Sequence, residues 1–162
     1  MELSTRYDEK LDTNLFFFLS KKLLTTYVLG VKPLGPGFAT WGVKPRIDGG
    51  GGGGSGGGSD DLQWARGVVP TPRGPLQVSW QRSSGVPGGI ELRVRAPGGT
   101  SGTVSVPVVL GDSEGKKALL DGKSGVGVLT ADGYVDFEVQ GGEEEHVVGY
   151  PLQQVEETPR GL

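Results

Sequence analysis

From Leu62 onward, apolar residues stand at every second position of the chain, in runs separated by clusters of glycine and proline. Such alternation buries one face of a strand and leaves the other in water, which is typical of antiparallel sheets. The pattern predicts an all-β fold, an antiparallel two-sheet β-sandwich. Pro107 lies inside one run and predicts an edge or a bulge there. The alternating residues are Leu76, Val78 and Trp80; Ile90, Leu92, Val94 and Ala96; Val104, Val106 and Val108; and Val135, Phe137 and Val139.

Turn-forming residues separate these predicted strands at residues 83–89, 97–102 and 131–133. The last of these is Ala-Asp-Gly and predicts a compact hairpin turn. Ahead of the strands, Leu15, Leu19, Leu23 and Tyr27 recur every four residues, which predicts one short N-terminal helix over 15–29 that Gly30 ends. Because a helix of this length is marginal alone, we expect it to pack on another surface.

Composition excludes several kinds of chemistry. The 162 residues include no cysteine and one histidine, so a disulfide framework, a thiol nucleophile and metal sites built from cysteine or several histidines are excluded. We expect no metal and no cofactor. Nine of the 31 glycines lie in residues 49–59, which predicts a flexible Gly/Ser insertion within the domain.

Charge gives no reason to expect nucleic acid as a partner, since the net charge is −3. No segment is apolar over enough residues to span a membrane, and the N-terminus lacks the positive region of a signal peptide, so the compartment stays open. Residues 62–110 hold five arginines and one glutamate, and we expect cross-strand pairing of these arginines with Asp136 or Glu138. The run 143–145 of glutamates is interpreted as a solvated turn.

One motif imitates a hydrolase site. Residues 111–115 read Gly-Asp-Ser-Glu-Gly, and Asp132 or Asp136 and then His146 follow in the order of an α/β-hydrolase triad. That site requires a parallel sheet and a full helix after the serine, whereas the strands here alternate and Gly122 interrupts the segment that follows. We therefore nominate no catalytic residue and interpret His146 as structural.

The three tryptophans are the remaining candidates for a site. Trp80 ends an alternating apolar face and is predicted to be core. Trp41 and Trp64 are each open to two interpretations: core or interdomain contact, or an exposed platform on which a sugar ring stacks.

Two segments resemble a known family. The segment 27–41 (Tyr-Val-Leu-Gly-Val-Lys-Pro-Leu-Gly-Pro-Gly-Phe-Ala-Thr-Trp) and the segment 62–80 (Leu-Gln-Trp-Ala-Arg-Gly-Val-Val-Pro-Thr-Pro-Arg-Gly-Pro-Leu-Gln-Val-Ser-Trp) resemble the C-terminal part of α-L-rhamnosidases of glycoside hydrolase family 78, the fungal and bacterial members above all. Residues 92–100 and 104–107 fit the same domain. The resemblance implies a β-sandwich that follows an (α/α)6 catalytic barrel, whose last helix corresponds to residues 23–29 and whose catalytic residues lie upstream of this sequence.

The resemblance sets the predicted organisation of the chain. Residues 1–24 look unrelated to the family, because the His-Gly-Trp-like run expected there is replaced by residues 14–22. Residues 25–157 are the predicted sandwich and 158–162 a tail. The implied function is a non-catalytic accessory domain without its barrel partner, with possible self-association through the exposed N-terminal helix. Two alternatives stay open: a carbohydrate-binding module, and a non-functional product of a truncated gene.

Overall fold

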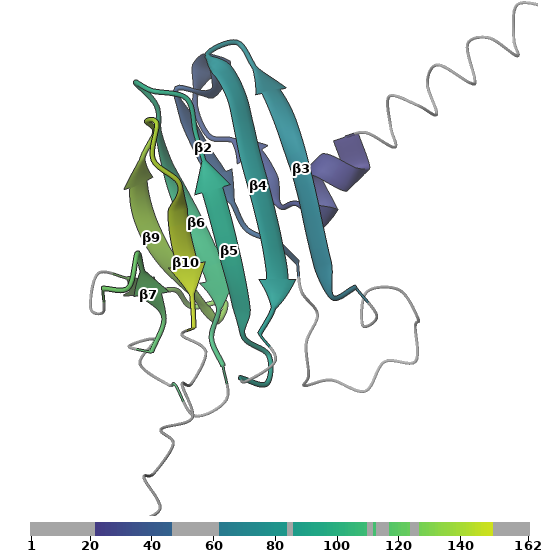
Figure 1. Ribbon diagram of the computed structural model, residues 1–162, viewed down its shortest axis with the longest axis vertical. Helices are drawn as coiled ribbons and strands as arrows, with labels where there is room; N and C mark the ends of the chain where they lie inside the picture. The colour runs from purple at the N-terminus through teal and green to yellow at the C-terminus, as the bar shows by residue number, and fades with distance from the viewer. Residues whose placement is uncertain are drawn as a thin grey trace, which may run out of the picture.

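Two five-stranded sheets face each other in the computed structural model, which describes residues 22–46, 62–83, 86–109, 112, 117–123 and 127–150 (Figure 1). One sheet has the strand order β1-β2-β6-β9-β8 and the other β3-β4-β5-β10-β7. The predicted all-β sandwich is confirmed. The strands are β1 (Val31–Pro33), β2 (Thr40–Val43), β3 (Trp64–Thr71), β4 (Gly74–Arg82), β5 (Ile90–Arg95), β6 (Ser101–Pro107), β7 (Leu119–Leu120), β8 (Val128–Leu129), β9 (Tyr134–Gln140) and β10 (His146–Gly149).

Seven of the eight strand pairings in the described part of the chain are antiparallel, and β2 pairs with β6 in parallel. Thr40 stands opposite Ser101 and Val43 opposite Val104 in that pair. Parallel neighbours need a long connection, and here β3, β4 and β5 of the opposite sheet lie between them along the chain. The prediction of antiparallel strands thus holds for all but one neighbour pair.

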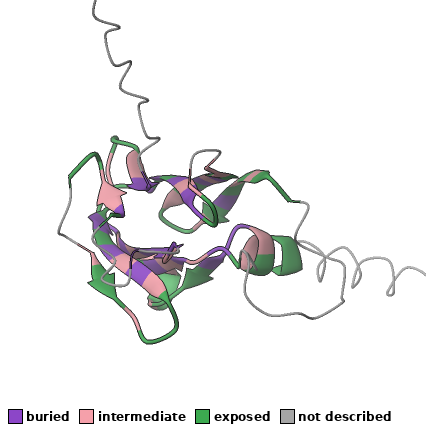
Figure 2. Ribbon diagram, turned by 90° about the horizontal axis from the view of Figure 1, so that it is seen from below, coloured by how far each residue is buried: buried purple, intermediate pink, exposed green. Residues whose placement is uncertain are grey.

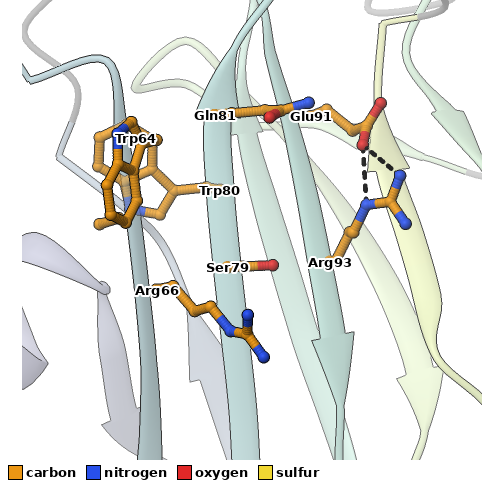
Figure 3. Close-up of a pocket in the computed structure, with 8 residues that line it drawn as sticks. Trp64, Arg66, Ser79, Trp80, Gln81, Glu91 and Arg93 are labelled. Carbon is orange, nitrogen blue, oxygen red and sulfur yellow. Dashed lines mark hydrogen bonds and ion pairs between the residues drawn. The ribbon is translucent and has the colours of Figure 1, made fainter.

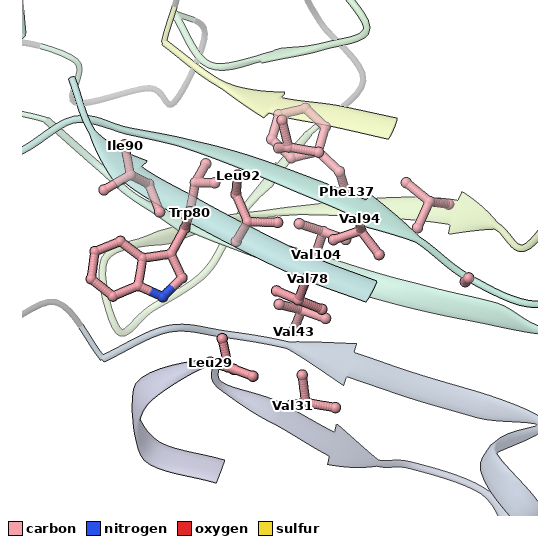
Figure 4. Packing of buried hydrophobic residues seen from close by; sticks show 14 of the residues in the cluster. Leu29, Val31, Val43, Val78, Trp80, Ile90, Leu92, Val94, Val104 and Phe137 are labelled. Atoms are coloured by element: carbon pink, nitrogen blue, oxygen red, sulfur yellow. The ribbon is translucent and has the colours of Figure 1, made fainter. Parts of the chain in front are cut away.

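The predicted alternation decides which residues face the interior. Each of the alternating sets contributes buried residues to one core between the sheets (Figure 2, Figure 4). Trp41 and Phe137 are among its largest members. Gly102 lies directly opposite Trp41 across the β2–β6 pair, and a Cβ there would collide with the indole ring. The small residue on β6 therefore makes room for the large one on β2. The predicted turn at 131–133 is also confirmed: it joins β8 to β9, with Gly133 at φ +79°.

Pro107 does not mark an edge, because β6 lies between β2 and β9 in the middle of its sheet. It is the last residue of β6, and β2 has already ended opposite Val104. The next residue, Val108, donates its N–H to the Gly133 carbonyl on the β9 side. Since successive residues of a strand point their N–H groups to opposite sides, the proline nitrogen faces the side that β2 has left.

The N-terminal helix is confirmed in its described part, residues 22–28, and the remainder of the predicted helix lies outside the described residues. Its last turn, η1 (Leu24–Val28), closes with a wide hydrogen bond from the Leu29 N–H to the Leu24 carbonyl, 3.1 Å long. Gly30 then adopts φ +75°, which glycine accepts without strain and which ends the helix as predicted. A short 3-10 turn, η2 (Pro36–Phe38), connects β1 to β2.

Several predicted boundaries lie where the structure describes no residues, including most of the segment 1–24, the whole insertion 49–59 and the tail 158–162. Those boundaries, and the sandwich limits 25–157, stay predictions. Within the described residues, no helix is both long and apolar enough to cross a membrane.

Candidate functional site

The structure separates the three tryptophans. Trp80 is 4% exposed and belongs to the core, as predicted. Trp41 is 1% exposed, and its Nε1 donates to the Thr100 hydroxyl at 3.1 Å, so the interpretation of Trp41 as a sugar platform is wrong. Trp64 is 66% exposed and is the one tryptophan placed to meet a ligand.

Trp64 belongs to an ordered array on the outer face of the β3-β4-β5 sheet. Strand register places Trp64, Gln81 and Glu91 in one row across the three strands. The next row on the same face holds Arg66, Ser79 and Arg93. Residues two apart along a strand are about 7 Å apart, and neighbouring strands are about 4.8 Å apart, so these six side chains share a compact patch. We call these six residues the Trp64 face.

The Trp64 face is hollowed. All six of its residues line a depression of about 280 Å3, and Figure 3 shows Trp64 at one side of it, with Arg66 and Ser79 on adjacent strands. A second depression of about 250 Å3 adjoins it and shares Arg66, Ser79 and Arg93. Together they form a shallow strip with an aromatic end and a cationic middle.

The two arginines of the strip differ in their partners. Arg93 contacts Glu91 at 2.8 Å and Glu145 at 3.5 Å, and the hydrogen bond to Glu91 is the main reason that the pKa of Arg93 is raised. Among the described residues, the Arg66 guanidinium makes no hydrogen bond or ion pair. The site therefore holds one compensated and one uncompensated cation.

These partners correct the predicted arginine pairing. Asp136 and Glu138 lie on β9, which belongs to the opposite sheet, so arginines on β3 to β5 do not stand across from them. Arg93 pairs instead with Glu91 on its own strand and with Glu145, a member of the acidic run 143–145. That acidic residue is 49% exposed in its side chain, in keeping with a solvated turn.

Two-carboxylate glycoside hydrolysis finds no free pair of acids in this strip, since both of its glutamates contact Arg93. Glu91 lines the first hollow and Glu145 the second. That chemistry requires two carboxyl groups about 5 to 10 Å apart across the sugar. The Trp64 face can stack, donate hydrogen bonds and attract an anion, which are the properties of a binding surface.

Among the described residues of the apparent hydrolase motif, His146 pairs with neither Asp132 nor Asp136. His146 Nδ1 lies 2.8 Å from Asp121 Oδ2, so the histidine pairs with an aspartate outside the motif order. The serine of the motif lies outside the described residues, and Asp112 accepts the Lys117 N–H at 3.0 Å. Leu119 and Leu120 form the short strand β7 where a hydrolase would need a helix.

His146 lies between two acceptors, because its Nε2 is 3.0 Å from the Gln140 carbonyl. The hydrogen bond with Asp121 is the main cause that raises the pKa of His146. For Asp121, burial acts to raise the pKa, but hydrogen bonds from His146 and from the Val147 N–H lower it overall. Among the described residues, no group of three or more acids and histidines is placed to hold a metal ion.

Sequence reasoning found Trp64 but did not combine it with Arg66 and the residues of β4 and β5. Alternation already placed Trp64 and Arg66 on one face, since they are two positions apart. What joined them to Ser79 and Arg93 was the register between strands, which one sequence does not state.

With the sandwich and its outer face described, comparison with known proteins identifies the family. Residues 30–119 match the model of the bacterial alpha-L-rhamnosidase C-terminal domain, so the chain belongs to that family of C-terminal domains. This confirms the resemblance drawn from the sequence. No curated protein matches the chain.

Two solved structures share the fold. The Streptomyces avermitilis alpha-L-rhamnosidase complexed with L-rhamnose is 22% identical over 79% of this chain, with a TM-score of 0.57. The alpha-L-rhamnosidase from Dictyoglumus thermophilum is 18% identical over 78% of this chain, with a TM-score of 0.58. The match spans 10% and 13% of those two proteins, so this chain corresponds to one small part of each.

Proposed function

We propose that this chain acts as a non-catalytic accessory domain of an α-L-rhamnosidase-like glycoside hydrolase. One observation carries the proposal: the described strands build a β-sandwich, and residues 30–119 match the model of a rhamnosidase C-terminal domain. We assign cleavage of the glycosidic bond to a separate catalytic part. The sandwich binds or supports that part.

The exposed apolar residues of the N-terminal helix favour a contact between this chain and another structural unit. Leu23, Leu24 and Tyr27 are 52%, 58% and 48% exposed on the described helix, directly ahead of the residues that match the family model. An apolar helix face of this kind is stabilised when a second apolar surface covers it. A catalytic barrel is the proposed cover, and a second copy of this chain is the substitute when the barrel is absent.

The transcript that encodes this chain tests the accessory role. If the domain works within a rhamnosidase, the reading frame should continue upstream of the Met1 codon into a series of amphipathic helices. A stop codon in that frame just upstream of Met1, in a mature transcript, would contradict the proposal that the chain is joined to a barrel.

Sedimentation velocity tests the exposed helix face independently. We expect the chain alone to form dimers or larger species as its concentration rises, and the variant Leu23→Ser/Leu24→Ser/Tyr27→Ser to remain a monomer. A matched control is Leu34→Ser, because Leu34 is 61% exposed but lies on the β1–η2 connection. Equal behaviour of the wild-type chain and the triple variant would contradict association through the helix.

The Trp64 face favours a second candidate function, binding of a saccharide. An indole that is 66% exposed beside Gln81, Ser79 and two guanidinium groups offers both a stacking surface and donors for sugar hydroxyl groups. Isothermal titration with oligosaccharides tests this function, and Trp64→Ala should weaken any binding that uses the face by about tenfold.

A further inference from the structure

We propose that the saccharide recognised by the Trp64 face is acidic, with a sugar ring stacked on Trp64 and a carboxylate bound by Arg66. This inference rests on the proposed saccharide-binding function and adds the chemical class of the ligand. It is carried by the charges of the outer sheet face and by the positions of their partners.

The face carries more cationic than anionic groups. Arg66, Arg93 and Arg95 point outward from β3 and β5, together with Glu91 and the nearby Glu145. Both glutamates contact Arg93. In the described part of the chain, no partner of the Arg66 or the Arg95 guanidinium is found, and these three arginines and two glutamates together carry a net charge of +1.

Arg66 is positioned to select a carboxylate. Its guanidinium presents a planar set of donors that matches the two oxygens of a carboxylate, and it lies in the same hollow as Trp64. Ser79 is directly opposite Arg66 on β4 and adds a hydroxyl that donates to the same anion. A neutral sugar offers the Arg66 guanidinium no opposite charge, so it forms no charge-assisted hydrogen bond in this half of the hollow.

Trp64 sets the second requirement on the ligand, a flat apolar ring face. It lies two residues from Arg66 on one strand face, about 7 Å along the strand. Gln81, directly opposite Trp64, supplies an amide that can both donate to and accept from sugar hydroxyl groups. An elongated ligand with a flat apolar ring face and a carboxylate nearby satisfies both ends of the hollow at once, and a uronic acid residue has that combination.

The direct test compares an oligomer of galacturonate with its fully methyl-esterified form, in which a neutral ester replaces each carboxylate. Isothermal titration should detect binding of the acid oligomer to the full chain, and the esterified oligomer should bind at least about tenfold more weakly. Binding should also weaken as salt is raised, because the hollow is open to solvent.

Variants separate the two halves of the site. Arg66→Gln should weaken binding of the acid oligomer by about tenfold to a hundredfold while leaving binding of the ester unchanged. Trp64→Ala should weaken both ligands by about tenfold. The matched control is Arg73→Gln, which removes one exposed arginine from the β3–β4 turn at the opposite end of the strand pair and should change neither affinity.

The outcomes of these titrations distinguish the acidic ligand from the saccharide-binding function on which it rests. Equal binding of the two oligomers, unaffected by Arg66→Gln but weakened about tenfold by Trp64→Ala, overturns the acidic ligand and retains the saccharide-binding face. Binding of neither oligomer overturns both. Equally tight binding of poly-L-glutamate, insensitive to Trp64→Ala, would show a general attraction for polyanions and would overturn recognition of a sugar.

Discussion

The indole Nε1 of Trp80 on β4 donates a hydrogen bond to the carbonyl oxygen of Val28, the last residue of η1, at a distance of 2.8 Å. The two residues are 52 positions apart in the chain. Gly67 on the neighbouring strand β3 strengthens the same junction, because its missing side chain leaves space for Leu29. The end of the helix is thereby held against the sandwich while the helix surface around Leu23 and Tyr27 stays exposed.

Replacing Trp80 by phenylalanine should test that anchor. The ring remains apolar, but the hydrogen bond to Val28 and part of the buried volume are lost, so we expect the free energy of unfolding to fall by about 1 to 3 kcal/mol. Urea denaturation followed by circular dichroism measures the change. Trp64→Phe is the control, since Trp64 is largely exposed, and its effect should stay below about 0.5 kcal/mol. Similar losses in both variants would contradict the anchoring role of Trp80.

Gly102 should not tolerate a side chain, although its backbone is not in the left-handed region. A Cβ at this position would collide with the Trp41 ring, whose Nε1 is already tied to Thr100. We expect Gly102→Ala to lower the free energy of unfolding by about 1 to 3 kcal/mol. Gly98→Ala is a suitable control, because a Cβ there meets nothing within 4 Å. A neutral effect of Gly102→Ala would show that the packing of Trp41 is looser than described.

The predicted sandwich and the structure agree most closely where alternation is strict. In β4, β5 and β9 the residues predicted to face inward are the ones that are buried, because a period of two leaves each strand only one apolar face. A strand such as β10 gave no comparable signal: it is short, follows the acidic run 143–145 and is placed by pairing with β5. The parallel pairing of β2 with β6 likewise depends on residues about sixty positions apart.

In the candidate site, too, some features follow from the sequence pattern and others depend on contacts between distant residues. The exposure of Trp64 and the burial of Trp41 were both open from the sequence, because either indole could fill a core or face water. The deciding partners of Trp41 are Gly102 and Thr100, which lie far along the chain. The Trp64–Arg66 pair was visible as two residues on one face, but its combination with Ser79 required the register between β3 and β4.

His146 should titrate above its ordinary range in the folded protein. Its pKa is raised mainly by the hydrogen bond with Asp121, so the folded state holds the imidazolium proton more tightly than the unfolded chain. The stabilisation is complete below the unfolded pKa of about 6.5 and is lost as the pH rises through the higher folded pKa. For Asp121 the folded pKa is lowered, so its contribution is present above the ordinary aspartate pKa of 3.8 and is lost as the pH falls through the folded pKa.

Proton NMR can follow this titration without ambiguity, since His146 is the only histidine of the sequence. We expect Asp121→Asn to return the midpoint toward the ordinary histidine value, while the asparagine carbonyl oxygen still accepts the Val147 N–H. Asp132→Asn is the control, because Asp132 pairs with Lys44. An unchanged midpoint in Asp121→Asn would mean that the carboxylate does not set the pKa of His146.

The central claim is that the sandwich does not itself cleave a glycosidic bond. It binds a saccharide or supports a separate catalytic part. Incubation of the purified, folded chain with an aryl α-L-rhamnoside tests it most directly, with release of the aryl alcohol followed by absorbance. If the sandwich is non-catalytic, the rate equals that of the buffer blank at every protein concentration. Release that rises in proportion to the chain, and that survives further purification, would contradict it.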